Sequence, residues 1–261
     1  MSEQEQRVEA HEEGSRTGFA QNGMVQGVPG KNIELNGVLD LRGVPAEQVA
    51  SIESLRINGL VLMDKGNRNA LAGVKSEING TVMVADPDLR ILVEPDFQFS
   101  QATLEGMPSG QKLMLVGTVF FKPDVPPALV AEKFADLRIV GILVACEGVY
   151  GALLGKMEMT GISITLPPDA GPVVRSMGEN TLTVDYVSRL QADSTYINIG
   201  ETSIADDVSE DLLARKIRTY YNVGVTRAPA PLLALLKSRC PTNLGDFAEP
   251  GGEEQAEAGD P

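Results

Sequence analysis

The sequence predicts an α/β repeat protein, a solenoid of about ten units of about 21 residues, each pairing a strand with a short helix in one continuous parallel sheet. The stretch LRINGLVLM at residues 55–63 returns as LRIVGILVA at 137–145. A glycine recurs in similar apolar surroundings along most of the chain. Apolar residues alternate with other residues before these glycines. A parallel β-helix without helices is the alternative.

The recurring glycines define the units. They are Gly37, Gly59, Gly80, Gly117, Gly141 and Gly161, with weaker copies at Gly200 and Gly224. Most spacings lie between 20 and 24 residues, and two gaps of 37 and 39 residues are nearly twice as long. Each long gap holds a strand-like segment, ILVEPDFQF at 91–99 and NTLTVDYV at 180–187, that we expect to fill the missing unit.

The alternation predicts strands that are buried on one face. Apolar residues stand four and two places before the glycine in most units, as at Ile33 and Leu35. After the glycine the apolar character is often continuous, which predicts burial on both faces. The copies around Gly200 and Gly224 place apolar residues one position over, for example at Ile197 and Ile199. We interpret this shift as a register change or an imperfect alignment.

Short helix-like segments separate the strands, at 45–54, 126–136, 149–157, 209–218 and 229–239. Several begin with proline, which the first helical turn tolerates. A strand and one short helix cannot bury their apolar faces alone, so we expect the units to stack. The segment at 231–244 is predicted to be a helical cap.

Composition divides the chain into a disordered polar tail at 1–31, a single solenoid at 32–245 and a disordered acidic tail at 246–261. The net charge is −14, but the body between the two tails has 25 acidic and 19 basic residues, a net charge of −6. We therefore expect no nucleic-acid partner and no membrane partner. Two cysteines, no apolar leader and no long apolar stretch indicate a cytoplasmic protein.

Three triplets resemble the LxxLxL core of leucine-rich repeats, especially the short bacterial type. They are Ile52-x-x-Leu55-x-Ile57, Phe134-x-x-Leu137-x-Ile139 and Leu154-x-x-Met157-x-Met159. The chain departs from that family by placing Leu60, Ile142 and Ile162 at the position of the family asparagine. The resemblance implies a repeat scaffold that binds protein partners on the open face of its sheet.

Stacking would place residues at equal offsets from the glycine side by side, about 4.8 Å apart. Three places before the glycine, charges alternate in sign, and one place before it three consecutive units have asparagine. Opposite charges and stacked amides on neighbouring strands both stabilise the register. The residues that we expect to form a protein-binding surface are Glu34, Asn36, Arg56, Asn58, Glu77, Asn79, Met114, Arg138, Glu158 and Thr160.

The sequence offers little catalytic chemistry. His11 is the only histidine and lies in the polar tail, and the two cysteines make no zinc pattern. We therefore expect no catalytic residue, no metal and no cofactor. The expected function is a non-enzymatic protein-binding scaffold, whose partner is another protein or a second copy in a homo-oligomer. The alternatives are a structural protein that polymerises through its solenoid ends and, third, a carbohydrate-active solenoid enzyme.

Overall fold

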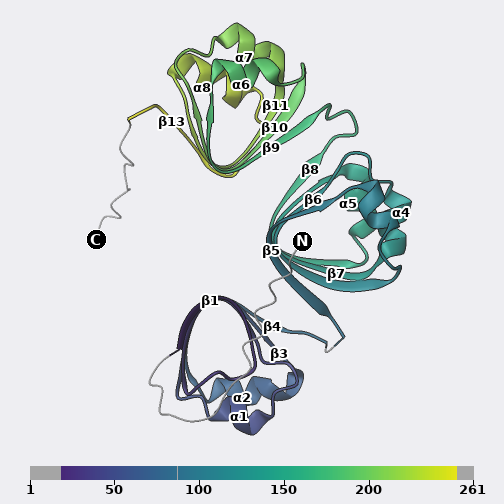
Figure 1. The fold of residues 1–261 in the computed structure, drawn as a ribbon, viewed down its shortest axis with the longest axis vertical. Helices are drawn as coiled ribbons and strands as arrows, with labels where there is room; N and C mark the ends of the chain where they lie inside the picture. The colour runs from purple at the N-terminus through teal and green to yellow at the C-terminus, as the bar shows by residue number, and fades with distance from the viewer. Residues whose placement is uncertain (1–18, 87, 252–261) are drawn as a thin grey trace. The chain divides into compact units, whose positions relative to one another are not determined.

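The computed structural model describes residues 19–86 and 88–251. Strands and short helices alternate along the chain, and the strands form three separate parallel sheets (Figure 1). The α/β class and the repeated strand-helix units are therefore confirmed, whereas the expected single continuous sheet is wrong. None of the helices in the described residues has the length and apolar character needed to cross a bilayer.

We call each sheet with its helices a block. The first block contains β1 (Phe19–Gln26), β2 (Asn32–Asp40), β3 (Ser54–Met63) and β4 (Lys75–Val84), hydrogen-bonded in that order. Its helical segments are α1 (Ala46–Ala50), the 3-10 turn η1 (Lys65–Asn67) and α2 (Arg68–Ala72). Strand β1 lies within the segment that the sequence predicts as a tail, and residues 1–18 lie outside the described residues.

The second block contains β5 (Arg90–Phe99), β6 (Gln111–Phe121), β7 (Phe134–Cys146) and β8 (Met157–Leu166), again in sequence order. Its helices are α3 (Gln101–Glu105), α4 (Pro127–Lys133) and α5 (Glu147–Leu153). Strand β5 confirms the strand expected at 91–99.

The third block contains β9 (Val173–Leu182), β10 (Ser194–Ile204), β11 (Ile217–Arg227), β12 (Thr242–Asn243) and β13 (Asp246–Ala248). Both β12 and β13 pair with β11, so together they occupy one strand position. The helices are α6 (Val184–Arg189), α7 (Glu210–Lys216) and α8 (Ala230–Ser238). The strand expected at 180–187 is wrong in its bounds, because β9 ends at Leu182 and α6 follows. Helix α8 overlaps the cap predicted at 231–244. Strand β13 lies beyond residue 245, where the sequence predicts the acidic tail to begin.

Prolines occur where one sheet ends and the next begins. Strand β5 has Glu94 and Pro95 where the other strands of its sheet have their glycine. Because a proline has no N–H to donate to a neighbouring strand, a strand with a central proline lies at a sheet edge, as β5 does. The link from β8 to β9 at 167–172 has no helix and contains three prolines.

A glycine with positive φ bends almost every strand at its middle, and we call these residues the bend glycines. In the first block Gly37, Gly59 and Gly80 lie side by side in register, with φ between +146° and +156°. A Cβ on Gly59 would lie 2.0 Å from the carbonyl oxygen of Gly37, and one on Gly80 would lie 1.8 Å from that of Gly59. No side chain fits such a separation, so the stack requires glycine at each level.

The bent strands enclose an inner face on which the helices of the same block pack (Figure 1). In the first block Ile33 and Leu35 form one apolar cluster with Val49 of α1 and Leu71 of α2. In the second block Phe99, Phe121 and Phe134 stack or meet edge to face, with ring centroids 5.0 to 6.0 Å apart. In the third block the rings of Tyr196 and Tyr220 are parallel, with centroids 5.6 Å apart.

Contacts divide the described chain into two units. The first unit combines β1–β4 with residues 90–95, 111–117 and 136–138, which belong to the N-terminal halves of β5, β6 and β7. The second unit contains the rest of those strands together with β8–β13. The C-terminal halves of β5, β6 and β7 therefore share a unit with β8 and the third block, and their packing within it can be described.

Each block has two outer surfaces, one on either side of its bend glycines. We call the outward positions three and one places before the bend glycines the leading surface, and those one and three places after them the trailing surface. In the second unit, Ile197 and Tyr221 of the third block's leading surface are buried in one cluster with Phe120, Val144 and Ile164 of the second block's trailing surface. This apolar cluster is the joint between these two blocks.

An ion pair lies beside the joint. The guanidinium of Arg175 on β9 donates to both carboxylate oxygens of Asp96 on β5, at 2.6 and 3.0 Å. It also lies over the ring of Phe120, 4.3 Å from the centroid. The hydrogen bond from Arg175, opposed by partial burial and assisted by Gln98, lowers the pKa of Asp96.

The joint corrects our interpretation of the shifted apolar residues. Gly178, Gly200 and Gly224 are paired in register, so the strands around them have not slipped. Ile197 and Ile199 are apolar because they point outward into the joint, whereas Asn198 between them points inward and is buried. A one-residue shift in the hydrophobic pattern therefore reflects which face is covered.

The block is the long-range repeat of this chain. Equivalent bend glycines recur after 80 to 84 residues, as in Gly59, Gly141 and Gly224 of the third strand position. The two similar stretches at 55–63 and 137–145 are therefore β3 and β7, the same strand of successive blocks.

We expect Gly59→Ala to lower the free energy of unfolding by about 3 kcal/mol, because the methyl group meets the Gly37 carbonyl and φ is positive. Gly151→Ala in α5, where nothing lies within 4 Å, should leave stability equal or slightly higher. Urea unfolding of both variants measures the difference. Equal stability of the two variants would contradict the role of the bend glycines.

We expect Asp96→Asn to destabilise the protein by about 2 kcal/mol at neutral pH, because it leaves the largely buried Arg175 without its anion. The folded-state pKa of Asp96 is lowered, so its contribution is present above its ordinary value of 3.8 and is lost as the pH falls below that value through the folded-state pKa. The stability gap between the wild-type chain and the variant should therefore stay constant above about pH 5 and narrow as the pH falls to about 3. A gap that stays constant down to that pH would contradict the ionic role of Asp96.

Candidate functional site

The leading surface of the first block combines six of the ten residues that the sequence predicts for binding. Strands β2, β3 and β4 place Glu34, Arg56 and Glu77 in one row, because these residues are paired in register. The guanidinium of Arg56 lies 3.1 Å from Glu77 Oε2 and 3.9 Å from Glu34 Oε1. Each of the three side chains is about 60% exposed, at 61%, 59% and 60% for the three in chain order. The alternating charges are therefore paired and also accessible.

A row of amides runs beside the charges. Asn58 Nδ2 donates to Asn36 Oδ1 at 2.7 Å, and Asn79 Nδ2 donates to Asn58 Oδ1 at 3.0 Å. The predicted amide ladder is therefore confirmed, and all three side chains are exposed. Asn58, the middle amide, both donates and accepts along the row, so the row fixes the orientation of its side chain.

The other four predicted residues lie on the second block and do not join this surface. Met114 is fully buried, because its half of β6 packs within the first unit, so it cannot contribute to an open surface. Arg138 is half-buried and lies 3.2 Å from Asp136. Glu158 and Thr160 are exposed on β8. The binding surface is therefore smaller than the sequence predicts.

A second amide ladder lies inside the third block, and sequence reasoning missed it. Asn198 Nδ2 donates to Asn222 Oδ1 at 2.9 Å, and Asn222 Nδ2 donates to Asn243 Oδ1 at 2.8 Å. Thr202 and Thr226 donate to the amide oxygens of Asn198 and Asn222, at 2.8 and 3.0 Å. The sequence feature that could have predicted this ladder is an asparagine two places before both Gly200 and Gly224, at a position whose side chain points inward. This network satisfies buried polar groups and serves the core.

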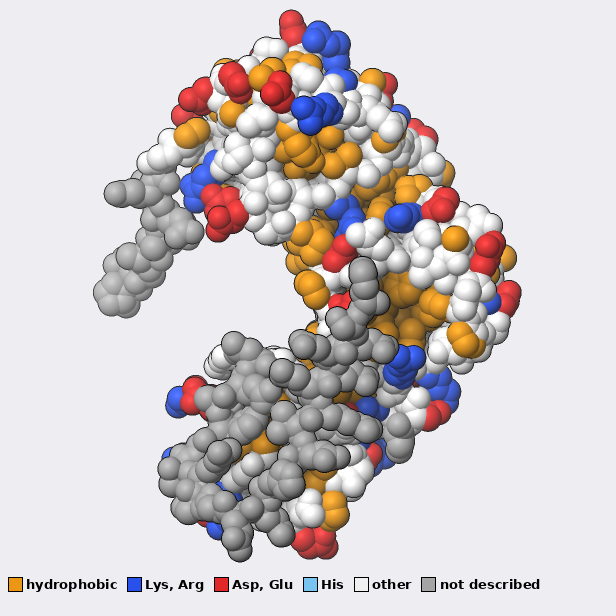
Figure 2. Space-filling model, viewed as in Figure 1, with side chains coloured by type: hydrophobic (Ala, Val, Ile, Leu, Met, Phe, Trp, Pro, Cys, Tyr) orange, Lys and Arg blue, Asp and Glu red, His pale blue; other side chains and the backbone are white. Residues whose placement is uncertain are grey.

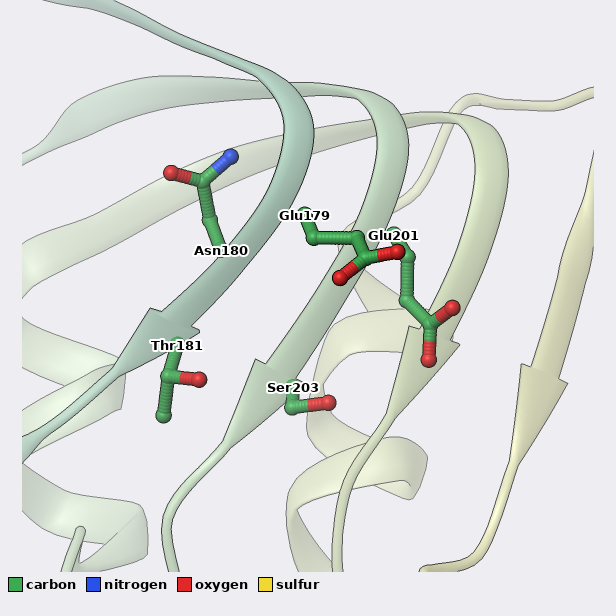
Figure 3. A pocket seen from close by; sticks show the side chains of 5 residues that line it. All are labelled: Glu179, Asn180, Thr181, Glu201 and Ser203. Carbon is green, nitrogen blue, oxygen red and sulfur yellow. The ribbon is translucent and has the colours of Figure 1, made fainter.

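The trailing surface of the third block has a shallow polar cavity of about 350 Å³ (Figure 3). Its lining residues are Glu179, Asn180, Thr181, Glu201 and Ser203, from β9 and β10. Glu179 and Glu201 are paired in register, which places two carboxylates beside each other, and Glu201 also accepts from Arg227 Nε at 2.8 Å. The lining is polar and acidic, so the cavity suits hydrogen-bond donors. The sequence did not reveal the pair, because its members lie on separate strands.

The cysteines do not supply a nucleophile. Cys146 and Cys240 are free and half-buried. Burial raises the pKa of both thiols, and Glu147 raises that of Cys146 further. A raised pKa keeps a thiol protonated at neutral pH and unreactive. Residues 19–86 and 88–251 contain no group of three or more His, Cys, Asp or Glu arranged to hold a metal.

Comparison with known proteins gives no match, whether with family models, with curated proteins or with solved structures. Acidic and basic side chains are interspersed on the face shown in Figure 2 and do not gather by sign. The leading surface of the first block, with its paired charges and its amide ladder, is a polar arrangement that is both ordered and exposed.

We expect the two amide ladders to differ in their contribution to stability. Asn222→Ala should cost about 3 kcal/mol, because it removes the hydrogen bonds that the buried Asn222 side chain makes with Asn198, Asn243, Asp246 and Thr226. Asn58→Ala should cost less than about 1 kcal/mol, because water replaces the lost partners. Thermal or urea unfolding of both variants measures this, and equal costs would contradict the assignment of one ladder to the core and the other to the surface.

Proposed function

We propose that this chain is a non-enzymatic scaffold of the solenoid type that binds a protein partner on the leading surface of its first block. The observation that carries the proposal is a contrast between equivalent surfaces. The leading surface of the third block is apolar and covered, whereas that of the first block is polar, ordered and open. A strand face that is not needed for packing is available for recognition.

The order of the surface supports binding. Its side chains are fixed along the rows by the ion pairs of Arg56 and by the amide bonds of Asn58. Groups that are already ordered lose little conformational entropy when a partner docks. The strands beneath them are fixed by the stacked bend glycines, so the spacing of the recognition groups is rigid.

The charge pattern indicates the kind of protein surface that fits. Two exposed carboxylates flank one guanidinium, so a complementary partner presents an acidic group opposite Arg56 and basic groups opposite Glu34 and Glu77. Partner hydroxyls or amides can form hydrogen bonds with the exposed side chains of Asn58 and Asn79. A uniformly basic partner, such as a nucleic-acid-binding protein, would leave Arg56 facing like charge.

The test is Arg56→Glu, which gives a row of three carboxylates. We expect stability to change by less than about 1 kcal/mol, because the pairs are exposed. Capture of a partner from extracts of the source cell should fall about tenfold or more, because like charges then oppose each other across the interface. Quantitative affinity enrichment, with a photo-crosslinking side chain at Asn58 to prove contact, measures this.

The matched control is Arg189→Glu on α6 of the third block, which makes the same charge change at another exposed arginine. It should leave capture unchanged. Equal enrichment of the same proteins by the wild-type chain, Arg56→Glu and Arg189→Glu would show that this surface does not bind the partner. No crosslink from Asn58 would have the same meaning.

A further inference from the structure

Each described block has a leading and a trailing surface, and the joint pairs the trailing surface of the second block with the leading surface of the third. We call the leading surface of the first block and the trailing surface of the third block the unused halves, because no described block packs on them. Inside the second unit, a trailing surface packs on the leading surface of the next block. Among the described residues, no block precedes the leading surface of the first block and none follows the trailing surface of the third. A second copy of the chain would continue the series if the third block of one copy packed on the first block of another.

The unused leading surface differs from the used one at equivalent positions. The third block presents Ile197 and Ile199 on β10, and Tyr221 and Val223 on β11. The same positions of the first block, on β2 and β3, are Glu34, Asn36, Arg56 and Asn58. All four polar side chains are exposed. An apolar partner on this surface would remove the charges from water without offering hydrogen bonds or opposite charges in exchange, which costs free energy.

The unused trailing surface shows the same replacement. The second block presents Phe120, Val144 and Ile164 three places after its bend glycines, and these residues are buried. The equivalent residues of the third block are Ser203, Arg227 and Ala248. One place after the bend glycines, Ile142 and Ile162 of the second block correspond to Val225 and Asp246 of the third.

The two unused halves also carry charge of the same sign. On the first block two carboxylates, Glu34 and Glu77, outnumber the single Arg56. On the third block the carboxylates of Glu179, Glu201 and Asp246 outnumber the single Arg227. Two surfaces with excess negative charge repel each other, in a chain whose formal net charge is −14.

We infer that the joint between blocks is a transferable interface, and that polar, acidic residues at its two unused halves prevent copies of this chain from joining head to tail. A trailing surface and a leading surface form a heterologous contact, which gives an open series when it does not close on itself. The replacement on both surfaces therefore opposes head-to-tail association of two copies through their first and third blocks. This inference concerns self-association and does not depend on the proposed partner of the first block.

The test transfers the apolar residues of the internal joint to the ends. The leading graft is Glu34→Ile, Asn36→Ile, Arg56→Tyr and Asn58→Val. The trailing graft is Glu201→Thr, Ser203→Phe, Arg227→Val and Asp246→Ile. The control puts four apolar residues on exposed helix positions of the third block, as Ser188→Ile, Arg189→Ile, Glu210→Tyr and Asp211→Val. Light-scattering mass after size exclusion is measured over a wide range of concentration, with circular dichroism to verify folding.

We expect the wild-type chain and the helix control to keep a constant mass. The chain with both grafts should grow with concentration, and an equimolar mixture of the two single-graft chains should stop at one copy of each. A wild-type chain that grows, a folded double-graft chain that keeps the mass of one chain, or a helix control that grows equally would overturn the inference. If the full grafts do not fold, Asn36→Ile with Asn58→Val, and Ser203→Phe with Arg227→Val, repeat the test with two changes at each end.

Discussion

The close stacking of bend glycines is the constraint on which the rest of the structure depends. A Cβ on Gly59, Gly161 or Gly224 would lie 2.0 Å from the carbonyl oxygen of the bend glycine on the preceding strand. The stack therefore fixes both the bend of each strand and its register with the next. Because a bent strand encloses an inner face, one short helix is enough to cover it, and the charged and amide rows outside follow from the same register.

The alternation of inward and outward residues then assigns different tasks to chemically similar residues. Asn58 and Asn222 both belong to amide ladders, but Asn58 stands one place before its bend glycine and points outward, whereas Asn222 stands two places before and points inward. The outward ladder orders a surface, and the inward ladder satisfies polar groups in a core. In the same way, the apolar side chains of Tyr221 and Val223 belong to a joint between blocks and not to the core of their own block.

The functional proposal follows from the surfaces that packing leaves open. The joint between the second and third blocks consumes an apolar leading surface and an apolar trailing surface. The corresponding surfaces at the two ends are polar, and the one on the first block holds its groups in ordered rows. Recognition by such a surface depends on charge complementarity and on rigid spacing more than on buried apolar area. The Asp96–Arg175 pair lies beside the joint and links β5 to β9.

The sequence by itself determined the local unit: a strand with apolar residues at Ile33 and Leu35, a glycine, and a helix. These features can be read from the sequence because strands and helices repeat every two and every 3.6 residues, so that residues close in sequence share a face. The amide and charge rows of the first block were also predictable, since similar units must stack. Only the tertiary structure decided that the units group into blocks, that Met114 is buried and that Glu179 lies beside Glu201. Those outcomes depend on which strands and outer surfaces pack against each other. Contacts between residues that are distant in sequence produce no periodic pattern along the chain, so the sequence does not reveal them.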